Sequence, residues 1–145
     1  MQDKILLLTP PFTQLNTPYP ATAYLKGFLN TKNIASFQAD LGIEVMLSIF
    51  SKEGLIAVFE KAQTFEAPSD NMQRILKLKD TYIHTIDAVI SFLQGKNPTL
   101  AHRIAQRNFL PEAQRFDQLE DLNWAFGAMG IQDKAKYIAT MYLED

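Results

Sequence analysis

The sequence contains no cysteine. A disulfide framework, a thiolate nucleophile, a cysteine-ligated zinc and an iron–sulfur cluster are therefore excluded within these residues. The glycine-rich motifs G-x-G-x-x-G and the P-loop are also absent, so the sequence offers neither of these two phosphate-binding loops.

Long hydrophobic runs and dense basic tracts are absent too. The apolar run Ile5–Leu8 is far shorter than the roughly 18–20 residues of a membrane span, and Pro10 and Pro11 end it before it could form a signal-peptide core. Fourteen lysines and arginines face 16 aspartates and glutamates, which gives a net charge of −2. We therefore expect a cytoplasmic protein with neither a nucleic-acid nor a membrane partner.

The N-terminal 42 residues predict a βαβ unit. Ile5–Leu8 is a short apolar run typical of a strand buried on both faces. A loop with four prolines follows, and the apolar spacing over 21–30 predicts a helix. A second strand is expected over 34–39, and Asp40-Leu41-Gly42 is expected to form a turn. The two strands should be parallel, and the crossover between them should be right-handed.

Residues 43–145 are predicted to be entirely helical. Short helices are expected over 43–50 and after Ser51, which can cap its helix. The near-heptad spacing of apolar residues over 70–94 predicts one long bundle helix ended by Gly95, with a coiled-coil partner as the alternative. The last helix is expected over 133–143 with four side chains inward, which are Tyr137, Ile138, Met141 and Tyr142.

The predicted fold class is therefore α/β but mostly helical. Residues 1–42 form a βαβ unit with two parallel strands, and residues 43–145 form a helical region. Two parallel strands do not complete a sheet, because such sheets need both faces covered and usually contain several strands. We expect either an N-terminal fragment of a longer doubly wound protein or a strand pair whose edge dimerises.

The candidate site lies where the two strands end. Ligands of open parallel sheets bind beyond the carboxyl ends of the strands, and a proline-stiffened loop holds its polar groups at low entropic cost. The alternative is a loop that merely packs on the helices. The candidate cofactor-binding residues are Pro10, Pro11, Thr13, Gln14, Asn16, Thr17, Asp40 and Gly42.

Four segments together resemble a known family. They are Leu6-Leu7-Leu8-Thr9-Pro10-Pro11-Phe12, Asn16-Thr17-Pro18-Tyr19-Pro20, Ala23-Tyr24-Leu25-Lys26-Gly27-Phe28-Leu29, and a second strand that ends in Asp40. This order resembles the N-terminus of cobalamin-binding-domain radical S-adenosylmethionine proteins, which are Fe–S oxidoreductases. The resemblance covers about a third of the chain, and the helical remainder resembles, more weakly, an insertion in one branch of the family.

The resemblance implies cobalamin as the cofactor of the strand-end edge, with Pro10, Pro11, Thr13 and the turn at Asp40 lining it. The Asp-x-His-x-x-Gly motif is absent, so the binding mode would be the one without a histidine ligand. S-adenosylmethionine and a 4Fe–4S cluster would belong to a downstream domain with a Cys-x-x-x-Cys-x-x-Cys motif. These 145 residues would then be inactive alone, with downstream domains of the same polypeptide or a second copy as partners.

Other chemistry-bearing residues are sparse. His84 and Asp87 are three residues apart on the predicted long helix, and His102 is the other histidine. A hydrogen-bonded or solvated helix histidine is the simpler interpretation, since a metal or a general base would need more partners. No catalytic or metal-binding residue is therefore predicted. The alternative function is a helical interaction or dimerisation module with no cofactor.

Overall fold

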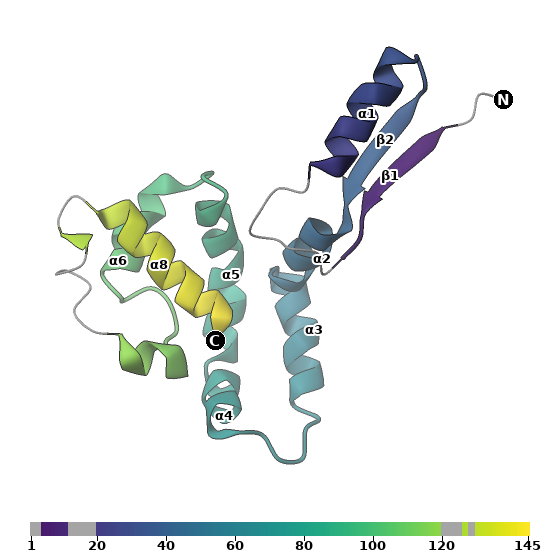
Figure 1. Cartoon of the computed structure of the whole chain (residues 1–145). Helices are drawn as coiled ribbons and strands as arrows, with labels where there is room; N and C mark the ends of the chain where they lie inside the picture. Colours follow the sequence, from purple (N-terminus) through teal and green to yellow (C-terminus); the bar gives the residue numbers. More distant parts are fainter. Residues whose placement is uncertain (1–3, 12–19, 120–125, 128–129) are drawn as a thin grey trace. The chain divides into compact units, whose positions relative to one another are not determined.

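The computed structural model describes residues 4–11, 20–119, 126–127 and 130–145. It is mostly helical, with an N-terminal two-stranded parallel sheet that is not closed (Figure 1). The chain divides into two compact units, Met1–Ser48 and Ile49–Asp145. The first unit thus extends beyond the predicted boundary at residue 42, because it includes most of a helix that directly follows the second strand.

The N-terminal unit contains the predicted βαβ arrangement. Its elements are β1 (Ile5–Thr9), α1 (Ala21–Thr31), β2 (Ser36–Asp40) and α2 (Leu41–Ile49). The two strands are parallel, as expected, and pair from Ile5 with Ser36 to Thr9 with Asp40. Figure 1 shows α1 lying along one face of this strand pair.

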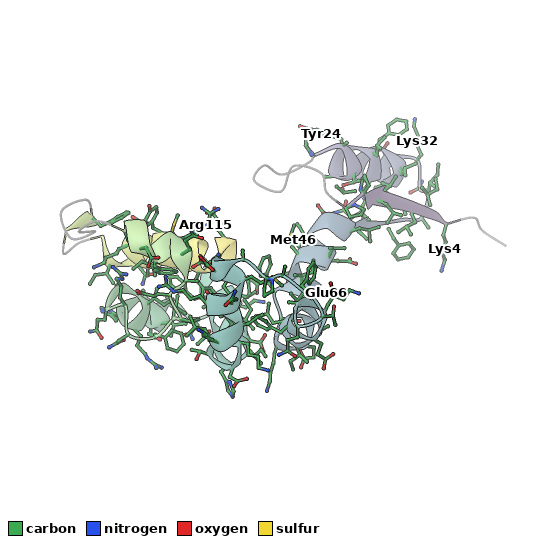
Figure 2. The ribbon with its side chains drawn as sticks, turned by 90° about the horizontal axis from the view of Figure 1, so that it is seen from below. Lys4, Tyr24, Lys32, Met46, Glu66 and Arg115 are labelled. Carbon is green, nitrogen blue, oxygen red and sulfur yellow. The ribbon has the colours of Figure 1, made fainter. Side chains whose placement is uncertain are left out.

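The other face of the strand pair is apolar and exposed. Side chains alternate between the faces of a strand, and Leu6 and Leu8 are 60% and 47% exposed, whereas Thr9 is buried. Phe37 pairs with Leu6 and is 54% exposed. The Lys4 ammonium lies 5.8 Å from the centre of the Phe37 ring, and Lys4 points away from α1 in Figure 2. Within the described residues, nothing completes this sheet.

The second unit is helical and follows its capping signals. Ser51 Oγ accepts a hydrogen bond of 3.0 Å from the Gly54 amide, and Ser69 Oγ accepts one of 3.3 Å from Met72. Gly95 ends a helix with φ of 76°. The described elements are α3 (Lys52–Ala62), α4 (Asp70–Lys77), α5 (Lys79–Leu93), η1 (Pro98–Leu100), α6 (Ala101–Ala105), η2 (Gln114–Gln118) and α8 (Ile131–Glu144).

The prediction of one long helix from Asp70 to Gln94 is wrong. The helix is interrupted at Leu78, whose φ and ψ of −96° and 2° lie outside the α-helical range. Leu78 and the end of α4 pack against the same core as α5. The break lets both segments turn their apolar faces inward, which one straight heptad stripe would not do.

The core of the helical unit is formed by side chains from all of its main helices. The most deeply buried large residues are Ile86, Val89, Ile104 and Ile138. Tyr137, which we expected inward, is 39% exposed instead, while Ile138 and Tyr142 are buried. No helix among the described residues combines the length and the apolar character that a membrane span requires.

Candidate functional site

The structure brings the ends of the two strands together, as the candidate site requires. Thr9 and Asp40 are paired neighbours at the carboxyl ends of β1 and β2. Pro10 follows Thr9 directly and is exposed, and Pro11 is half-buried. Pro10, Pro11 and Asp40 therefore lie at one edge of the strand pair. The predicted site residues Thr13, Gln14, Asn16 and Thr17 lie outside the described residues.

The expected turn at Asp40-Leu41-Gly42 is wrong, because α2 begins at Leu41. Asp40 Oδ1 accepts a hydrogen bond of 3.1 Å from the Ile43 amide, which is the bond of a helix N-cap. The side chain satisfies one of the free amides at the start of α2, so the strand passes directly into a helix without a separate turn. Asp40 thus has a local structural role at the site edge.

Gly42 is buried within the first turn of α2. A buried glycine lets neighbouring groups approach closely, but it offers little surface to a ligand. Its contact with a cofactor stays a prediction, as do the cofactor contacts of Pro10, Pro11 and Asp40. Among the described residues of this edge, Asp40 supplies a carboxylate.

The two histidines have separate environments. His84 Nδ1 lies within hydrogen-bond distance of the Asp80 carbonyl oxygen in the preceding turn. Asp87 contacts a different helix: its Oδ1 accepts a hydrogen bond of 3.0 Å from the Lys52 amide at the start of α3. His102 is exposed on α6. Among the described residues, no three histidine, aspartate or glutamate side chains are grouped as a metal site would require.

Sequence reasoning missed an apolar cavity in the helical unit. It is a half-open pocket with a volume of about 180 Å³. Side chains from α3, α4, α5 and α8 line it, together with Phe50 and Asp145. Leu55 and Phe59 line it from α3, and Tyr82 and Ile86 from α5. The only available signal was the spacing of Tyr82, Ile86 and Val89, which marks a buried helix face but not a cavity.

Tyr82, Tyr142 and Asp145 are the residues with polar side-chain groups in the lining of this pocket. The Tyr82 and Tyr142 rings are stacked with centroids 5.0 Å apart. The Tyr142 hydroxyl donates to the Tyr82 carbonyl oxygen at 3.1 Å and lies 3.0 Å from Thr85 Oγ1. The Tyr82 hydroxyl is also buried but has no hydrogen-bond partner within the described structure. Burial raises the pKa of Tyr82, and the nearby Asp145 carboxylate raises it further.

Comparison with known proteins gives no relative: no family model, no curated protein and no solved structure matches this chain.

Proposed function

We propose that residues 4–48 are the first βαβ unit of a cobalamin-binding-like domain. The whole protein would be a cytoplasmic radical S-adenosylmethionine Fe–S oxidoreductase, and this chain would be its non-catalytic N-terminal region. The observation that supports the proposal is the parallel pairing of β1 with β2, which places Pro10 and Asp40 at one strand-end edge. That edge is where open α/β sheets bind their ligands.

The exposed sheet face is a second support for this proposal. Leu6, Leu8 and Phe37 would be covered if further strands and helices extended the sheet. In the proposed protein those elements come from the rest of the cofactor domain. The sequence resemblance supplies the cofactor and the reaction class, and the described residues supply only the edge that would hold the cofactor.

The alternative function, a helical interaction module built on residues 70–94, lacks an observation in its favour. The apolar face of α5 carries Tyr82, Ile86 and Val89, and all three side chains are buried inside their own unit. These three side chains are therefore not available to form a coiled coil with a second chain.

Titration with hydroxocobalamin tests the proposal. Binding to the folded chain should change the visible spectrum of the cobalamin and raise the thermal midpoint, because a ligand selective for the folded state stabilises it by mass action. The variant Pro10→Arg places a bulky charged side chain at the edge and should weaken both effects. The matched control Pro68→Arg, in the loop between α3 and α4, should not.

Two outcomes would contradict the proposal. One is the absence of any spectral or thermal change up to about 100 μM cobalamin, the concentration of a weak specific complex. The other is a coding sequence that continues beyond codon 145 without a Cys-x-x-x-Cys-x-x-Cys motif in the following few hundred codons.

A further inference from the structure

We draw no further inference here: the strongest candidate, the exposed apolar face of α1 that carries Tyr24 and Phe28 beside Gly27, is a helix face for which nothing in the structure shows what covers it.

Discussion

At the scale of single residues, the buried tyrosines predict a loss of stability in alkali. Burial raises the pKa of Tyr142 from its ordinary value of 10.0 to about 12 and also raises that of Tyr82. At pH values between 10 and 12, the unfolded chain therefore loses the Tyr142 proton while the folded chain keeps it. The free energy of unfolding should therefore be unaffected below pH 10 and should fall by about 1–3 kcal/mol as the pH rises to 12.

Urea unfolding at a series of pH values from 8 to about 12 measures this effect, and Tyr142→Phe is the informative variant. It removes one titrating hydroxyl and should reduce the alkaline fall, while lowering stability at all pH values because the bond to the Tyr82 carbonyl is lost. An alkaline slope that is the same in the variant and the original chain would contradict the assignment to Tyr142.

Gly95 has a backbone conformation that disfavours substitution. Its φ of 76° ends α5, and the Gly95 and Lys96 amides close the last turn on the carbonyls of Phe92 and Ser91. A side chain is disfavoured in this conformation although space is available for a Cβ. Gly95→Ala should lower the free energy of unfolding by about 1–2 kcal/mol in urea titrations. Gly95→Asn should lower the free energy of unfolding by less, because asparagine tolerates a positive φ better than alanine. Equal losses of stability in the two variants would mean that the positive φ is not the cause.

At the scale of elements, local signals predicted where most helices begin and end. Ser51 caps α3 through its own hydroxyl, as the sequence indicated. Ser69 caps α4 in the same way, and Pro98 begins the helical turn η1. These features depend on neighbours three or four residues away, so sequence shows them directly. The break at Leu78 was missed because it depends on packing against helices distant in the chain.

Some features of the candidate site could likewise be predicted from the sequence, and others could not. The approach of Pro10 to Asp40 follows from the parallel pairing of the two strands and was predictable. The capping role of Asp40 was missed, because the short sequence Asp-Leu-Gly is equally typical of a turn. The cavity could not be predicted, since Leu55, Ile86 and Tyr142 come together only in three dimensions.

The packing of α5 predicts a strong contrast between two isoleucines. Ile86 is 1% exposed in the core, and Ile56 on α3 is 38% exposed. Ile86→Ala should lower the free energy of unfolding by about 2–5 kcal/mol through lost burial and a residual cavity, whereas Ile56→Ala should cost well under half of that. Urea titration of both variants checks the assignment. Similar losses would mean that α5 turns a different face inward.

At the scale of the whole molecule, the two units differ in how well each buries its own apolar surface. The core of the helical unit is drawn from residues 50–143 and includes none of the first 48. Few side chains are buried among the described residues of the N-terminal unit. Its exposed large apolar residues include Leu6, Leu8, Tyr24, Phe28 and Phe37. The first unit thus has the composition of a sheet layer but not the cover that such a layer requires.

The uncovered strand pair should make this chain self-associate. Each strand has an unpaired edge within the described sheet, and Leu6 and Phe37 lie side by side on its exposed face. Sedimentation velocity at about 100 μM should therefore show species larger than a monomer. The double variant Leu6→Lys and Phe37→Lys should shift them toward the monomer, because burying two lysines is costly. Ile56→Lys places the same charge on an exposed position of the helical unit and should leave association unchanged. Two results would show that the sheet face does not drive association. One is a clean monomer for the unmodified chain at this concentration, and the other is an equal effect of the double variant and of Ile56→Lys.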